Sequence, residues 1–270
     1  MPQEKQQLDL LVVGLGRSGT TLLTHLLTNP EQGRLCLAEP RLTTRRAYRP
    51  EKQDYFRTLG VQGQVNTRTV AEHLFNQQRI GLKEIRSHHI KNAIKRYDPK
   101  HIVLITRDLR AALASYNERH AKRADSLPKS RRRFPAKLFL RTAPLMLRLL
   151  ETEKHRVTVT QYERFVSDEA ERNRLAELLD WPLDGNLGFY AATGRDNERK
   201  KHDGQISTKS LTRPLPTDPE TLAVLKPVFE RLAPYQRAFG YPVDWDAPPT
   251  TEPAPLRAEV TTTIKQTAHA

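Results

Sequence analysis

Three glycines and an arginine follow the first predicted buried strand. The segment from Gly14 to Gly19 reads GLGRSG, and Thr20 and Thr21 open the helix that follows it. Glycines let the backbone curl so that successive N–H groups point inward, and a helix N-terminus adds unpaired N–H donors with partial positive charge. The two threonine hydroxyls and the charge of Arg17 add to these donors. The loop therefore predicts a site for a phosphate or a similar anion.

Two common nucleotide-binding patterns overlap this loop. Gly14 and Gly19 have the P-loop spacing, but Thr20 stands where nucleoside-triphosphate hydrolases and kinases carry the Lys that contacts the β- and γ-phosphates. Gly14, Gly16 and Gly19 also match the GxGxxG of dinucleotide-binding folds, with Glu39 about 20 residues further on as a ribose-binding acid. An NAD(P)-dependent oxidoreductase therefore stays open, as does a glycine turn that only packs strand against helix.

A second group of polar residues follows the predicted strand His101–Thr106. Arg107 lies at the carboxyl end of that strand, where open α/β sheets place ligands. Ser115 and Arg119 are i and i+4 on the next predicted helix and share a face. Together these three residues would form a phosphate clamp. The alternative is a surface pair of Arg107 with Asp108 beside a solvated helix face.

The two segments together resemble the sulfotransferases that use 3′-phosphoadenosine 5′-phosphosulfate (PAPS) and share the P-loop fold. GRSGTTLL is similar to their 5′-phosphosulfate loop, in which a basic residue, here Arg17, precedes Ser-Gly-Thr-Thr. RDLRAALASY is similar to their 3′-phosphate motif, in which an Arg and a Ser eight positions later, here Arg107 and Ser115, hold that phosphate. The resemblance implies PAPS as co-substrate, no metal, and a nucleotide site that includes Gly16, Arg17, Ser18, Gly19, Thr20, Thr21, Arg107, Ser115 and Arg119.

Shorter matches extend the resemblance over most of the first 245 residues. Lys83 in GLKEI stands where related enzymes have a Lys that reaches the transferring sulfonyl group. The segment QYERF resembles one in the related enzymes, and Tyr162 stands where their Tyr lies near the nucleotide. Segment 201–210, KHDGQISTKS, resembles the loop that closes over PAPS, which adds Ser207 and Lys209 to the nucleotide site and Ser207, with Arg17 and Lys83, to the chemistry. A solvated Lys, a core Tyr and a flexible basic loop are the ordinary alternatives.

Sulfuryl transfer needs a general base to take the acceptor's proton. Glu39, in CLAEP just past the second predicted strand, is the first candidate, because tyrosylprotein-type sulfotransferases have a catalytic Glu in the matching segment. An ordinary strand-end acid is the alternative for Glu39. His88 and His89, after the third predicted strand, are the other candidates, since cytosolic sulfotransferases use a His from about that region.

A parallel sheet would bring these residues to one edge. Short apolar or β-branched runs alternate with helical patterns, which predicts a doubly wound α/β fold: a three-layer, P-loop-type architecture with a central parallel sheet of about five strands. The predicted strands are Leu8–Val13, Arg34–Leu37, Ile80–Lys83, His101–Thr106 and Arg156–Thr160. The predicted helices are Thr20–Thr28, Val70–Gln78, His89–Arg96, Leu109–Ala121, Leu138–Leu150 and Glu169–Leu179.

The amino-acid composition limits the classes of molecule that this protein is expected to bind. The 270 residues include 45 Lys and Arg against 31 Asp and Glu, a net charge of +14. An anionic nucleotide co-substrate and an anionic glycan or lipid-linked sugar as acceptor both fit this charge. A basic nucleic-acid-binding module is a further alternative, but an aromatic content of 7% argues against a base-stacking surface. The single Cys36 excludes an intrachain disulfide framework and a Cys-rich zinc site.

The organisation predicted is one domain over 1–245, with a basic helical insert at about 119–153 and a disordered tail over 246–270, which is rich in Pro and Thr. The basic run Arg119–Arg141 would flank the acceptor side or be a solvated face. No apolar run approaches the ~20 residues of a membrane span. We therefore expect a cytoplasmic protein.

Overall fold

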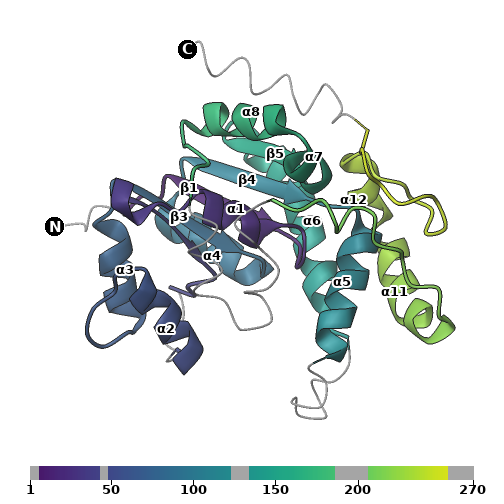
Figure 1. Ribbon diagram of the computed structural model, residues 1–270, viewed down its shortest axis with the longest axis horizontal. Coiled ribbons are helices and arrows are strands. Elements are labelled where there is room, and N and C mark those ends of the chain that lie inside the picture. Colours follow the sequence, from purple (N-terminus) through teal and green to yellow (C-terminus); the bar gives the residue numbers. More distant parts are fainter. Residues whose placement is uncertain (1–5, 43–47, 123–133, 186–205, 255–270) are drawn as a thin grey trace.

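The computed structural model describes residues 6–42, 48–122, 134–185 and 206–254 (Figure 1). A five-stranded sheet forms its centre, in the order β2-β3-β1-β4-β5, and all neighbouring strands are parallel. The prediction of a central parallel sheet of about five strands is confirmed. The strands are β1 (Leu10–Gly14), β2 (Arg34–Ala38), β3 (Arg79–Glu84), β4 (His101–Thr106) and β5 (Val157–Gln161).

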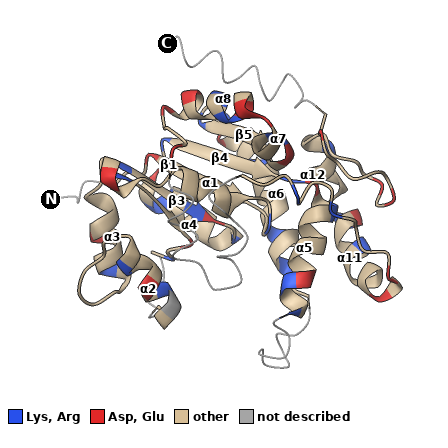
Figure 2. Ribbon diagram, viewed as in Figure 1, with Lys and Arg blue, Asp and Glu red and all other residues tan. Residues whose placement is uncertain are grey.

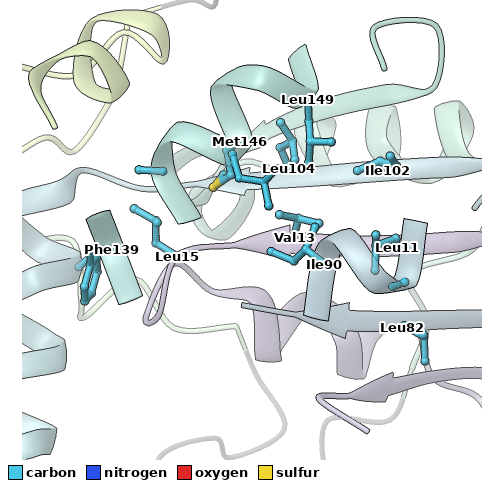
Figure 3. Close-up of a cluster of buried hydrophobic side chains, with 14 of the residues drawn as sticks. Leu11, Val13, Leu15, Leu82, Ile90, Ile102, Leu104, Phe139, Met146 and Leu149 are labelled. Carbon is cyan, nitrogen blue, oxygen red and sulfur yellow. The ribbon is translucent and has the colours of Figure 1, made fainter. Parts of the chain in front are cut away.

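The apolar runs form strands because both faces of this sheet are covered. Successive side chains on a strand point to opposite faces. In β1, Leu10 and Val12 therefore belong to one buried cluster, and Leu11 and Val13 belong to the other. Figure 3 shows part of the second cluster, in which strand residues face side chains of the covering helices such as Met146.

One face of the sheet is covered by three helices, one that follows β1 in the sequence and two that follow β5. They contribute Leu23, Phe165 and Leu175 to the same cluster as Leu10 and Val12. The indole nitrogen of Trp181 closes this layer by donating a hydrogen bond of 2.9 Å to the carbonyl of Leu27. The helices are α1 (Thr20–Leu26), α7 (Tyr162–Ser167) and α8 (Glu169–Leu179).

The opposite face carries the larger helical layer, so the three-layer prediction is also confirmed. The predicted insert at about 119–153 contains the end of α5 and all of α6. Helix α6 packs on the sheet through Phe139, Ala143 and Met146, despite the Pro144 inside it. The helices of this layer are α2 (Pro50–Thr58), α3 (Thr67–Phe75), α4 (Ser87–Tyr97), α5 (Leu109–Ala121), α6 (Ala136–Thr152), α11 (Pro219–Arg231) and α12 (Ala233–Ala238). No helix in the described ranges is both long and apolar enough to cross a bilayer.

Ordered chain continues beyond the boundary predicted at 245. The fully buried guanidinium of Arg110 donates hydrogen bonds to the carbonyls of Trp245, Ala247 and Pro248. The hydroxyl of Thr250 donates to Asp108 over 2.7 Å. Arg110 is also ion-paired with Asp108 over 2.6 Å, so this carboxylate and the backbone carbonyls together satisfy a buried cation. The number of apolar residues in the segment does not indicate such an interaction. Residues 246–254 are therefore part of the packed domain, and the rest of the predicted disordered tail, 255–270, lies outside the described residues.

Candidate functional site

An open cleft lies at the carboxyl edge of the sheet. Residues that follow all five strands line it, and its volume of about 1220 Å³ has room for more than one small ligand. A cleft lined mainly by positive charges, with low-dielectric walls, concentrates the electrostatic field and attracts anions. Figure 2 shows basic positions along α5, which borders the cleft. Among its described lining residues one is acidic, Glu39, and seven are Lys or Arg: Arg17, Lys83, Arg86, Arg107, Arg119, Lys137 and Arg141.

The glycine loop turns from β1 into α1 at the floor of the cleft. Gly19 has φ 86° and Arg17 has φ 73°, both in the left-handed region. A Cβ on Gly14 would lie 2.7 Å from the carbonyl oxygen of Ile105 in β4, so only glycine fits there. No side chain caps α1 and its first turn holds no acidic residue. The Ser18 N–H is used inside the loop, where it donates to the carbonyl of Leu15 over 3.2 Å. The start of α1 therefore offers positive potential to an anion without a capping side chain or an acidic residue in the way.

Gly19→Ala is expected to damage this loop by two effects. The new Cβ would lie 2.2 Å from the ring of Tyr162, and φ 86° is strained for alanine. We expect a loss of about 2–4 kcal/mol in the free energy of unfolding, measured by urea denaturation. Gly63→Ala is the matched control: its φ is 67°, but nothing lies within 4 Å of its Cβ. Equal losses in the two variants would show that the Tyr162 contact does not require glycine.

Arg107, Arg17 and Ser115 form one connected group. Arg107 Nη1 donates to the carbonyl of Arg17 over 2.8 Å, and Arg17 Nε donates to Ser115 Oγ over 3.1 Å. The Arg107 guanidinium lies over the ring of Tyr162, 4.4 Å from its centroid. Its Nε is buried without a hydrogen-bond partner among the described residues. Two of the three predicted clamp residues, Arg107 and Ser115, are therefore connected through Arg17, the third, Arg119, lines the same cleft, and Arg107 retains a donor.

Ser210 holds Tyr162 and Arg107 in place from the segment after residue 205. Its hydroxyl is 2.7 Å from the hydroxyl of Tyr162, and its carbonyl accepts from Arg107 Nη2 over 3.3 Å. Ser207 lines the cleft, whereas Lys209 is exposed and is not among the lining residues. The structure therefore brings Ser207 to the site, but not Lys209, because Thr208 and Lys209 lie on the exposed side of a turn that the hydrogen bond from the Leu211 N–H to the Thr208 carbonyl closes.

Glu39 and Lys83 form an ion pair on the other side of the loop. Lys83 Nζ lies 2.5 Å from Glu39 Oε1 and 3.5 Å from Thr21 Oγ1. The Lys83 side chain is 4% exposed and the Glu39 side chain 30% exposed. Lys83 thus carries a positive charge from β3 to the start of α1, close to where a P-loop Lys would place one. Sequence reasoning gave these residues separate roles and missed that they are paired.

The backbone and charge state of Glu39 are both unusual. Glu39 has φ 49°, and strained non-glycine residues concentrate at functional sites. Burial alone would raise the pKa of Glu39, but Lys83, Lys52 and Arg86 outweigh it and lower the pKa to about 2. The carboxylate is therefore ionised across the neutral range. Lys52, from the unpredicted helix α2, donates to the carbonyl of Ala38 and is a site residue that the sequence did not indicate.

Glu84 is a buried acid directly after Lys83, and its pKa gives a test of this charge cluster. Burial and then Glu39 raise the pKa of Glu84 to about 7. A raised folded-state pKa gives stability that is present below the unfolded pKa of 4.5 and lost as pH rises to 7. Between pH 5 and 8.5 we expect wild type to lose about 2 kcal/mol that Glu84→Gln does not lose, by urea unfolding. Parallel pH curves for both proteins would contradict this, and the exposed Glu177→Gln should follow wild type.

The rings of His88 and His89 are in contact, with centroids 4.0 Å apart and an angle of 41° between their planes. His88 is exposed and lines the cleft, while His89 is buried beneath it. Burial and then His88 and Arg86 lower the pKa of His89 to about 4. Of the two alternative bases, only His88 therefore reaches the cleft.

Most of the predicted site residues meet in the cleft. Ser115 joins it through Arg17, and the Ser18 hydroxyl is used inside the loop, where it donates to the carbonyl of Leu15 over 2.8 Å. Sequence reasoning missed Ser210, Lys52, Arg86 and Tyr116, whose ring packs on Gly16. The predicted residues among the lining are Gly16, Arg17, Gly19, Thr20, Thr21, Glu39, Lys83, His88, Arg107, Arg119, Tyr162 and Ser207.

Strand order argues against the dinucleotide-binding alternative. In that fold the strand that carries the ribose-binding acid lies next to the strand that enters the glycine loop. Here β3 lies between β1 and β2, and Glu39 after β2 is paired with Lys83. Within the part of the chain that the structure describes, no group of three or more His, Cys, Asp or Glu residues is arranged to hold a metal ion.

Comparisons with known proteins agree with the fold. No family model matches the chain, and no curated protein matches it. Among solved structures, the sulfotransferase domain from the curacin biosynthetic pathway has a TM-score of 0.55 and 15% identity, over 83% of this chain and 98% of that one. The sulfotransferase domain from the Synechococcus PCC 7002 olefin synthase covers 100% of this chain and 98% of its own at 15% identity, with a TM-score of 0.47, too low to support a shared fold by itself. The chain therefore shares the α/β fold of the first of these domains, with a central parallel sheet.

Proposed function

We propose that this protein is a sulfotransferase that moves a sulfuryl group from PAPS to a hydroxyl or amine of an acceptor. One observation carries the proposal: a single cleft is lined by residues of the glycine loop, by Arg107 and Arg17, and by the pair of Glu39 with Lys83, and Arg17 links this lining to Ser115. Neither an oxidoreductase nor a kinase would need these three features together. The fold similarity supports the same assignment.

Two anion sites would bind the nucleotide. The N–H groups of the glycine loop, with Arg17 and Lys83, would hold the 5′-phosphosulfate end. Arg107, Ser115 and Arg119 would hold the 3′-phosphate, because arginine forks bind phosphate oxygens through paired, charge-assisted hydrogen bonds. Tyr162, directly after β5, and Ser207, in the segment after residue 205, would complete the nucleotide site.

The transfer would be an in-line displacement at sulfur. The acceptor oxygen or nitrogen forms a bond to sulfur as the bond from sulfur to the 5′-phosphate oxygen breaks, and 3′-phosphoadenosine 5′-phosphate (PAP) leaves. Glu39 would accept the acceptor's proton once Lys83 turns toward the leaving oxygen and no longer lowers the pKa of Glu39. Lys83, already beside Thr21 in the loop, and Arg17 would balance the charge that develops on the leaving oxygen. The chain's own groups thus account for both proton and charge.

The acceptor in this proposal is a glycan, a glycolipid or a small metabolite, and its anionic character is inferred from the cationic lining of the cleft. Transfer of label from ³⁵S-PAPS to a panel of these acceptors, without added metal, tests the reaction. The proposal expects a labelled acceptor and stoichiometric PAP. Release of labelled sulfate alone at the same rate with and without every acceptor would contradict it.

A further inference from the structure

The cleft holds a second group of basic side chains, away from the glycine loop. Arg86 follows β3, and Lys137 and Arg141 are i and i+4 on α6, so they share one face of that helix. All three are exposed and line the cleft. No described acidic residue forms a salt bridge with Arg86, Lys137 or Arg141. Glu39 is the acidic residue among the described lining residues, and it is already paired with Lys83 while Arg86 also lowers its pKa. The positive charge of this group therefore exceeds the negative charge of the described residues around it.

A specific contact holds these charges together. The hydroxyl of Thr142 donates a hydrogen bond of 2.9 Å to the carbonyl of Ile85. Arg141 precedes one of these residues and Arg86 follows the other, so α6 and the end of β3 are fixed with the two guanidinium groups on the same wall. Their joint effect is visible at His88: after partial burial, Arg86 and Arg141 are the largest causes that lower its pKa.

Keeping several cations at one place without a counter-charge destabilises the free protein, because like charges repel. A bound anion would relieve that repulsion. The start of α4 adds to the same field: its first turn contains no acidic residue, and no side chain caps it. Ser87 and His88 of that turn also line the cleft.

We infer that Arg86, Arg141 and Lys137 form an oxyanion subsite for the acceptor, so that the acceptor carries a carboxylate, phosphate or sulfate group besides the group that receives the sulfuryl. This inference rests on the proposed function for its assignment to the acceptor. The arginines would bind the oxyanion through paired hydrogen bonds, and Lys137 would contribute as a point charge. The subsite would select acceptors by charge and orient them toward Glu39, which lines the same cleft.

The test uses PAP-saturated protein and the imidazole NMR signal of His88, assigned with His88→Gln. Acetate, inorganic phosphate and inorganic sulfate are each titrated at constant ionic strength. At least one is expected to shift the signal saturably, with half-saturation on the order of 1 mM. A saturable response to acetate would indicate that the acceptor carries a carboxylate, and a saturable response to phosphate or sulfate would indicate a tetrahedral oxyanion.

Two double variants separate a built subsite from general charge. Arg86→Glu/Arg141→Glu is expected to weaken the response about tenfold or more, and Arg86→Gln/Arg141→Gln does the same if the reversal perturbs folding. Lys91→Glu/Lys95→Glu makes the same change of net charge on exposed positions of α4 outside the cleft, and should stay within about twofold of wild type.

A shift that is linear, or equal in all these proteins, would overturn the inference, since it would report screening only. A saturable shift that PAP abolishes would assign the anion to the nucleotide site and overturn the acceptor role. Failure of PAP itself to bind would instead reject the proposed function, and the titration of the unliganded protein would then decide the anion site separately.

Discussion

Glu39→Gln is expected to bind PAP with the affinity of wild type and to transfer sulfuryl about 10²–10⁴-fold more slowly, the contribution usual for a general base. The glutamine keeps the shape of the side chain at the strained φ of 49° but has no basic oxygen. Calorimetric titration with PAP measures the binding, and single-turnover transfer of label from PAPS measures the rate. The separation of the two readouts distinguishes proton transfer from damage to the nucleotide site.

His88→Ala is the control for Glu39→Gln, since His88 is the other candidate base that lines the cleft. We expect its transfer rate to remain within about tenfold of wild type, below the range of a general base. The opposite pattern, an active Glu39→Gln and an inactive His88→Ala, would assign the base to His88 and leave Glu39 only as the partner of Lys83.

Arg107→Ala should weaken PAP binding by about 1.5–3 kcal/mol, the scale of hydrogen bonds to a charged group. Arg107 also supports the loop through the carbonyl of Arg17 and the segment through the carbonyl of Ser210. Its removal therefore loosens two walls of the nucleotide site as well as the phosphate contact. Calorimetric titration of the variant with PAP and with adenosine 5′-phosphosulfate, which lacks the 3′-phosphate, measures the effect.

The second nucleotide decides what Arg107 contributes. If Arg107 binds the 3′-phosphate, the variant loses affinity for PAP and loses much less for adenosine 5′-phosphosulfate. Arg107→Lys should lie between the two, because a lysine keeps the charge but not the paired donors of a guanidinium. Equal losses for both nucleotides would reduce Arg107 to a support of the loop.

The fold was predictable from sequence because its signals are local. A strand buried on both faces is a nearly continuous apolar run, as in residues 101–106, and the turns between elements carry Gly, Pro or Asn. Helix α2 lacked such a signal, since Tyr55 and Phe56 are its only large apolar residues. The order of residues 246–254 depends on a buried Arg110, which is a tertiary effect.

The candidate site was predictable only where chemistry follows a strand end. Arg107 was found in this way, whereas Lys83, which lies inside β3, was found only through the resemblance of GLKEI to related enzymes. The pairing of Glu39 with Lys83 was not, because it depends on β2 and β3 being neighbours, and strand order is not written in any short segment. Arg86 and Arg141 were missed as a group for the same reason. They are brought together by a hydrogen bond between Thr142 of α6 and the carbonyl of Ile85 after β3, which are far apart in the sequence.

The most direct test of the central claim is calorimetric titration of the protein with PAP, beside ATP and NAD, without magnesium. We predict micromolar binding of PAP and at least about 100-fold weaker binding of ATP and NAD, because neither carries a 3′-phosphate for Arg107, Ser115 and Arg119. Binding of NAD or ATP in preference to PAP would contradict the account and show that the glycine loop serves a different nucleotide.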